Sequence, residues 1–100
     1  MRKIVISDYA QLKIKNLLEY IESKWSETVR QKFAQKLYGT VKIIKDSPEA
    51  FPKSDFNKSV HKCVITKQTT IFYKFNSNRV EIIAIFDTRQ DPNQIKKDIK

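Results

Sequence analysis

The sequence has very few of the residues that build loops, disulfides and metal sites. It contains one glycine, three prolines, one cysteine and one histidine in 100 residues. Because Cys63 is alone, an intrachain disulfide and a zinc site built on thiolates are excluded. Gly39 is the sole glycine, so a glycine-rich phosphate-binding loop cannot form. His61 has no second histidine to complete a ligand set, and we therefore expect no metal and no cofactor.

Long apolar runs are also missing. The N-terminal segment 1–7 has a basic start and only three consecutive apolar residues, which is too few for a signal peptide. No segment approaches the roughly 20 apolar residues of a membrane-spanning helix. We therefore expect a cytoplasmic protein without membrane contact. Hydrophobic residues make up 40% of the chain, which argues against general disorder, and the length suits a single domain over residues 1–100.

Acidic residues are in the minority, with 11 Asp and Glu against 20 Lys and Arg, for a net charge of +9. The excess is spread over both halves of the chain, so no separate basic tail exists. An evenly basic small protein suits an anionic partner such as RNA, DNA or an acidic protein segment. A lysine-rich solvated surface explains the same charge equally well, and composition alone leaves both open.

Hydrophobic periodicity predicts a strand at residues 2–6 followed by two helices. The first covers residues 8–24, and Asp8 has capping-box spacing to Gln11. The second starts at Ser26 or Thr28 and ends before Pro48. A short link makes the pair an antiparallel hairpin. The apolar stripes of the two helices comprise Tyr9, Ile14, Leu17, Leu18, Ile21 and Trp25, and then Val29, Phe33, Leu37, Val41 and Ile44.

Residues 47–58 read as a loop in which Phe51 and Phe56 are expected to be anchored in the core. Beyond it, segments 60–66, 69–76 and 80–88 are rich in β-branched and aromatic residues, and short polar links separate them. The predicted fold class is α+β: an N-terminal strand, an antiparallel helical hairpin and a three-stranded antiparallel meander.

The last predicted strand is apolar on both sides. Strict alternation places Ile83 and Ile85 on one face, and on the other Val80, Ile82, Ala84 and Phe86. A helical hairpin can cover only one face of a small sheet. The second face therefore requires either the C-terminal segment, where Asp91-Pro92 predicts a helix over 93–100, or a partner protein.

Polar residues that could carry chemistry lie around the predicted sheet. Metal-free RNA cleavage needs groups that activate the 2′-hydroxyl, protonate the leaving oxygen and stabilise the phosphorane, and Lys, Arg and Tyr can do so. Ordinary solvent-facing sheet polarity accounts for the same residues, and Cys63 reads as a packed core thiol rather than a nucleophile. The candidates are Lys62, Lys67, Tyr73, Lys74, Asp87, Arg89 and Gln90.

Two stretches resemble a known family. Segments 60–65 and 70–75 are similar to the second and third strands of the RelE/ParE toxin superfamily, where a basic residue and a hydrophobic strand precede a turn, an apolar pair and Tyr. Segment 80–92 is similar to the closing strand and its basic end in plasmid-stabilisation (ParE-like) members, and 86–92 is its most specific part. The order of elements matches that fold over nearly the whole chain.

The resemblance implies the toxin of a type II toxin–antitoxin system, neutralised by a co-encoded antitoxin whose segment wraps the toxin. One branch of the family cleaves mRNA on the ribosome, and ParE poisons DNA gyrase without nuclease activity. The nucleases carry an Arg just before the Ile/Leu-x-Tyr of the third strand, where this chain has Thr70. Gln90 replaces a second basic residue that is common after the position of Arg89, and no Tyr follows Tyr73.

These departures favour a ParE-like toxin that acts by binding, with gyrase as one possible target. The alternative is a ribosome-dependent mRNA endoribonuclease, metal-free, that uses Lys62, Lys67 and Arg89. A third hypothesis is a non-toxic member that only binds an antitoxin. The residues expected to bind the target or the antitoxin are Tyr73, Ile83, Ile85, Asp87, Arg89 and Gln90.

Overall fold

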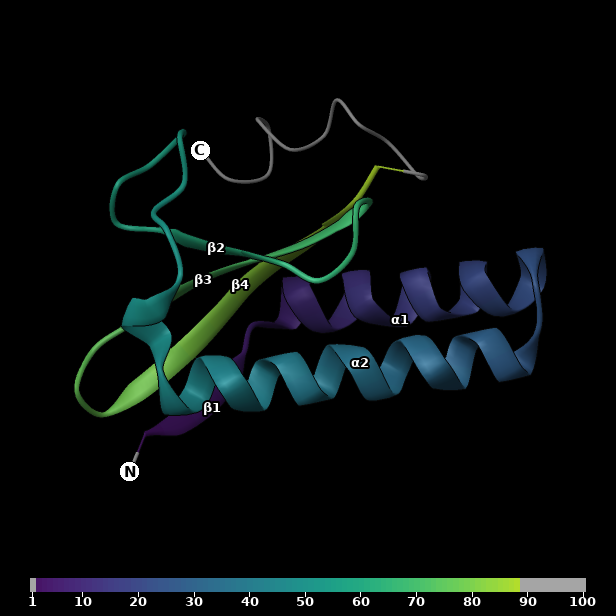
Figure 1. Ribbon diagram of the computed structural model, residues 1–100, viewed down its shortest axis with the longest axis horizontal. Helices are drawn as coiled ribbons and strands as arrows, with labels where there is room; N and C mark the ends of the chain where they lie inside the picture. Colours follow the sequence, from purple (N-terminus) through teal and green to yellow (C-terminus); the bar gives the residue numbers. More distant parts are fainter. Residues whose placement is uncertain (1, 89–100) are drawn as a thin grey trace.

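The computed structural model describes residues 2–88, which form a four-stranded sheet and a pair of helices (Figure 1). The strand order is β1-β4-β3-β2, and β1 runs parallel to β4 while the other neighbours are antiparallel. The predicted α+β fold class is confirmed. In chain order the elements are β1 (Lys3–Ile6), α1 (Asp8–Lys24), α2 (Glu27–Asp46), the 3-10 turn η1 (Pro48–Ala50), β2 (His61–Val64), β3 (Thr69–Phe75) and β4 (Arg79–Asp87).

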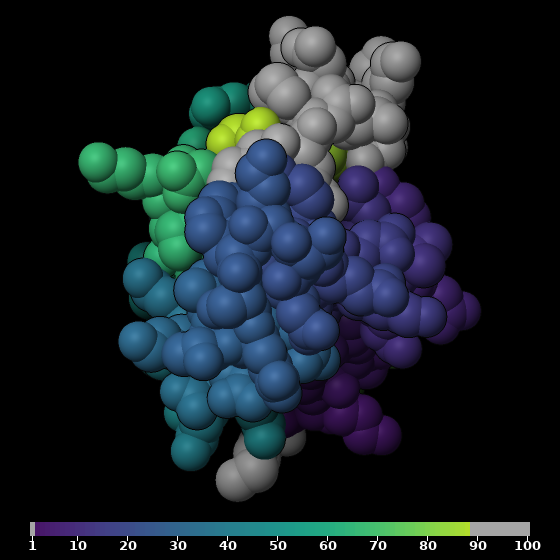
Figure 2. All heavy atoms as spheres, turned by 90° about the vertical axis from the view of Figure 1, so that its right-hand side faces the viewer, coloured from purple at the N-terminus to yellow at the C-terminus, as the bar shows by residue number. Residues whose placement is uncertain are grey.

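The two helices form the predicted antiparallel hairpin, but their first turns are capped by serines. The Ser7 hydroxyl accepts a hydrogen bond from the Ala10 N–H at 3.0 Å, so Asp8 is not the cap that its spacing suggested. Of the two alternatives for α2, Ser26 is the cap, and its hydroxyl accepts from the Val29 N–H at 3.1 Å. A view onto the turn between the helices shows α1 and α2 side by side (Figure 2).

The apolar stripes of the helices bury their central positions against the sheet. Their ends are more exposed than predicted: Tyr9 is 40%, Trp25 49% and Val29 41% exposed, because they lie in the end turns of the helices. The core between helices and sheet includes Ala10, Ile14, Leu17, Ile21, Phe33, Leu37, Val41, Ile44, Cys63, Ile71, Tyr73, Val80, Ile82 and Ile85.

One of the two predicted loop anchors is wrong. Phe51 packs against the core, with its ring edge-on to that of Tyr73, but Phe56 is 44% exposed. The loop is held instead by Ser54, which is buried. Its hydroxyl donates to the Asn57 carbonyl and accepts from the Asn57 N–H, and these local bonds fix the turn without an apolar anchor.

A β-bulge interrupts β4. Tyr73 pairs with Ile82 and Phe72 pairs with Ala84, so that Ile83 is an extra residue opposite the junction of two β3 residues. An inserted residue reverses the alternation of every side chain beyond it. Strict alternation is therefore a wrong guide to facing after Ile83.

The bulge redistributes the apolar residues of β4 between the two faces of the sheet. Ile85 joins Val80 and Ile82 in the helix-side core, and not the opposite face as predicted. Ala84 moves to the face away from the helices, where the buried residues are Val60, Phe72, Ala84 and Phe86. The prediction that β4 is apolar on both sides holds, although its two sets of residues differ from those expected.

Candidate functional site

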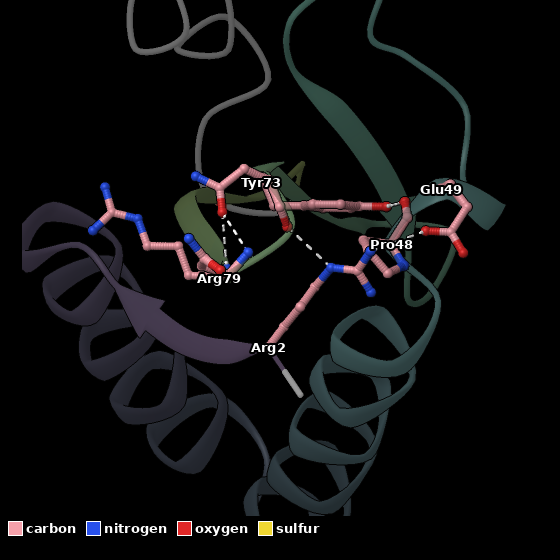
Figure 3. A network of polar contacts seen from close by, with 7 residues as sticks. Arg2, Pro48, Glu49, Tyr73 and Arg79 are labelled. Atoms are coloured by element: carbon pink, nitrogen blue, oxygen red, sulfur yellow. Dashed lines mark hydrogen bonds and ion pairs between the residues drawn. The ribbon is translucent and has the colours of Figure 1, made fainter.

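Tyr73, one of the predicted binding residues, is fully buried at the centre of β3. Its hydroxyl donates a hydrogen bond to the Pro48 carbonyl at 2.6 Å (Figure 3). Burial, with smaller contributions from Cys63 and Glu49, raises the pKa of Tyr73 well above its usual range. The side chain presents no surface to a partner, and its proton is engaged within the fold.

Arg2 organises the same end of the sheet. Its Nε donates to the Asn76 carbonyl at 3.0 Å, and its guanidinium lies 3.8 Å from the Glu49 carboxylate and above the Phe75 ring (Figure 3). The Asn76 side chain in turn accepts from the Arg79 N–H and shapes the β3–β4 turn. These contacts join β1, η1 and the turn, which is a structural role for the network.

His61 serves as a packing residue in the described structure. Its Nδ1 lies 2.9 Å from the Phe51 carbonyl, which requires an N–H at that nitrogen. The ring stacks on Tyr73 and lies beside Phe75, with ring centroids 5.5 and 5.0 Å away. Cys63 is buried in the core, in agreement with its assignment as a packed thiol.

The two lysines proposed for a nuclease mechanism lie on β2 and in the turn that follows it. Lys62 pairs with Asp55 at 3.8 Å, through side chains that are largely solvated. Lys67 is exposed in the β2–β3 turn, and among residues 2–88 it has no polar side-chain contact. The fold does not bring either lysine to a described tyrosine hydroxyl, because that of Tyr73 lies inside the core.

The remaining predicted binding residues follow β4 to its end. Ile85 is buried, whereas Ile83 at the bulge is partly exposed. Asp87 is also buried, and its carboxylate accepts a 2.6 Å hydrogen bond from the Thr69 hydroxyl, which ties the ends of β3 and β4 together. Arg89 and Gln90, like the predicted helix over 93–100, lie outside the described residues.

Sequence reasoning missed a hollow of about 450 Å³ between the helices and β1. One wall is the flank of α1, and the other is the flank of α2. The apolar side chains in it do not belong to either predicted core stripe alone, and only the packing of β1 beside the hairpin brings them together. Its lining residues are Ile6, Gln11, Ile14, Lys15, Leu18, Glu19, Arg30 and Tyr38.

Metal-ligating side chains do not gather in the described part of the chain. Among residues 2–88, no group of three or more His, Cys, Asp or Glu side chains is placed to hold a metal ion. Within the same range, neither helix has the length and apolar character needed to cross a membrane.

Comparisons with solved structures give the fold independently. A protein of the chromosomal ParDE toxin–antitoxin system of P. aeruginosa matches with a TM-score of 0.74 at 10% identity, over 87% of this chain and 96% of that one. YafQ from E. coli strain BL21(DE3) matches with a TM-score of 0.53 at 12% identity, and a YafQ mutant from E. coli with 0.57 at 10%. Each covers 90% of this chain and 97% of its own. No curated protein sequence matches significantly.

The family described as "ParE toxin of type II toxin-antitoxin system, parDE" matches residues 4–92, which is nearly the whole sequence. The match includes β4 and the segment after it, where the resemblance of the sequence was most specific. The chain belongs to the ParE toxin family of type II toxin–antitoxin systems.

Proposed function

We propose that this protein inhibits growth by binding a cellular target, with DNA gyrase as the target to test first, and that a co-encoded antitoxin neutralises it. The observation that carries the proposal is the family match over residues 4–92. The buried hydroxyl of Tyr73 and the separate placement of Lys62 and Lys67 support action by binding rather than by cleavage.

The antitoxin part of the proposal is tested in cells. Induced expression of the chain is expected to arrest growth, and co-expression of the protein from the neighbouring short reading frame is expected to restore it. Expression at a verified level without growth arrest would remove the toxin activity and leave an antitoxin-binding module. Arrest that the neighbouring protein cannot relieve would remove the neutralisation.

The gyrase part is tested with purified components. The chain is expected to inhibit supercoiling by gyrase, and the Arg89→Ala variant to inhibit less because the basic end beyond β4 is the proposed contact. Lys36→Ala, on the exposed surface of α2, is the matched control that keeps full inhibition. Unchanged supercoiling at saturating concentrations of the wild-type chain would exclude gyrase as the target.

The second candidate is a metal-free endoribonuclease of RelE type acting on translated mRNA. It is favoured by the basic side chains of Lys62 and Lys67 at the β2 end of the sheet, with Arg89 as the third proposed group. Primer extension on translated message would then show cleavage with the wild type and none with Arg89→Ala. Intact message with both proteins excludes this activity.

A further inference from the structure

One edge of the sheet carries open backbone groups. In β1, the N–H groups of Lys3 and Ser7 bond to carbonyls of the β3–β4 turn and β4, at 2.9 and 3.0 Å. In a parallel pair the intervening residues direct their backbone groups away from the partner strand. Ile4 and Ile6 therefore face outward, and within residues 2–88 the Ile4 N–H, the Ile4 carbonyl and the Ile6 N–H have no hydrogen-bonding partner.

The open edge of β1 has a defined end. The Ile6 carbonyl is already bonded, because the Gln11 side-chain amide donates to it at 2.8 Å. Beyond this point the chain enters α1 through its Ser7 cap. An added strand would thus pair along β1 and stop where the helix begins.

The opposite edge of the sheet is already occupied by the chain itself. The Lys62 N–H of β2 donates to the Pro52 carbonyl at 2.9 Å, and the Val60 carbonyl accepts from the Ser54 N–H at 2.7 Å. Segment 52–54 thereby covers most of β2 and leaves Val64 as its outward-facing residue. An unpaired strand edge is a template for adding another strand, and of the two edges β1 is the more open one.

The hollow between the helices continues from this edge. Ile6 lines it from β1, and Ile14, Leu18 and Tyr38 give it an apolar surface on the helices. An extended peptide paired with β1 can therefore place a neighbouring apolar side chain into the hollow. Backbone pairing supplies affinity in this mode, and a side-chain pocket supplies specificity.

The charges around the hollow identify the chemistry of the occupant. Lys15 lies on its rim, and Lys42 and Lys45 follow Tyr38 by one and two helical turns on the same side of α2. Among the lining residues, Arg30 already pairs with Glu22 at 3.4 Å, and Glu19 is the lining acid. The balance is positive, and with a net charge of +9 a second copy of the chain would be repelled.

We propose that the β1 edge and the adjoining hollow bind an extended acidic segment of the antitoxin as an additional strand of the sheet. This inference rests on the proposed function and deepens it, since it names the surface and the conformation of the partner. The Ile4 and Ile6 backbone groups pair with the segment, and one of its apolar side chains occupies the hollow.

Amide hydrogen exchange, followed by NMR on the full chain alone and with the antitoxin from the neighbouring reading frame, tests the pairing directly. Exchange of the Ile4 and Ile6 amides is expected to slow at least about tenfold in the complex, because their donors become hydrogen-bonded. The Val64 amide on the opposite edge is the internal control and is expected to be unchanged.

A matched pair of variants tests the same contact by affinity. Ile4→Pro removes the outward N–H, which an edge strand tolerates in its own fold, and Ile4→Ala shortens the side chain but keeps that donor. Ile4→Pro is expected to bind the antitoxin about tenfold more weakly than Ile4→Ala. Exchange measured on the unmodified chain keeps the test valid if the proline variant does not fold.

The outcomes separate this inference from the proposed function. A stable complex without slower exchange at Ile4 and Ile6, or with slower exchange at Val64 alone, overturns the β1 site and leaves the antitoxin partnership intact. Slower exchange of the free chain at rising concentration assigns the edge to a second copy and also overturns the proposal. Absence of any complex removes both the partnership and this site.

Discussion

Tyr73 illustrates how a residue with a functional appearance in sequence can have a structural role. The resemblance to the family draws attention to it because it ends the apolar pattern of β3. In the fold its ring is enclosed by His61 and Phe51, and its hydroxyl satisfies the buried Pro48 carbonyl. It therefore fastens η1 to the sheet.

Tyr73→Phe is expected to lower the free energy of unfolding by about 1–2 kcal/mol, because the Pro48 carbonyl loses its donor while buried. Urea unfolding measures the change. Tyr38→Phe is the control, since the Tyr38 side chain is half exposed and its loss of a hydroxyl should cost less than about 0.5 kcal/mol. Equal stability of the two variants would contradict a bond of any consequence at Pro48.

The same residue predicts an alkaline pH dependence. Because burial raises the pKa of Tyr73 above its unfolded value of about 10, the folded state holds the proton more tightly. The stability it contributes is complete below about pH 10 and decreases as the pH rises from there toward the higher folded pKa. Unfolding free energies of wild type should therefore fall more steeply above about pH 10 than those of Tyr73→Phe, and parallel curves would refute this.

At the scale of elements, the positions of the helix caps distinguish local spacing from actual geometry. Asp8 and Thr28 have capping-box spacing, yet the preceding Ser7 and Ser26 cap the helices. For α1 the reason is tertiary as well as local, because the Ser7 hydroxyl also donates to the Ile83 carbonyl of the bulge. The start of α1 is thus set by its attachment to the sheet.

Ser7→Ala is expected to destabilise the protein by about 1–2 kcal/mol, since both the α1 cap and the bond to β4 are lost. Asp8→Ala is the comparison, and it loses only a favourable interaction with the helix dipole, about 0.5 kcal/mol. Thermal or urea unfolding of both variants gives the ranking, and a larger loss for Asp8→Ala would reverse the assignment of the cap.

Gly39 is the one position in α2 whose residue type the described fold does not require. A Cβ built there meets no atom within 4 Å, so close approach of another element does not explain it. Gly39→Ala should therefore raise the free energy of unfolding by about 1 kcal/mol, which urea unfolding measures. Gln35→Gly, at an exposed site one turn earlier, should lower it by a similar amount; no gain from the alanine would point to a cost in packing.

At the scale of the whole molecule, the β4 bulge lets one strand supply both faces of the sheet. Ile82 and Ile85 fill the helix-side core while Ala84 and Phe86 join Phe72 on the other face. The apolar residues of β4 are thereby buried in two separate clusters. The sheet is consequently stabilised from both sides, which a strand with one polar face could not provide.

The net charge of +9 predicts how the whole molecule meets an acidic antitoxin. Long-range attraction raises the association rate, and salt screens it, so the rate constant should fall about tenfold or more between low and high ionic strength. Dissociation should change much less. Stopped-flow measurements over a salt series test this, with Lys32→Glu/Lys36→Glu as a less basic control; a rate independent of salt would exclude steering.

The sequence by itself determined the elements of this protein, their order and its family. Apolar spacing along α1 and α2 and β-branched runs in β2–β4 state local periodicity directly, and local periodicity is what sequence records. Thr70 and the segment after β4 likewise favour a ParE-like toxin through the identity of their residues alone.

Only the tertiary structure decided which side chains face which neighbour. The bulge at Ile83 follows from pairing with β3, and the burial of Tyr73 follows from the position of η1. The open edge of β1 exists because that strand pairs with β4, far away in sequence, and leaves its other side free. Such facts depend on contacts between distant segments, and no local pattern encodes them.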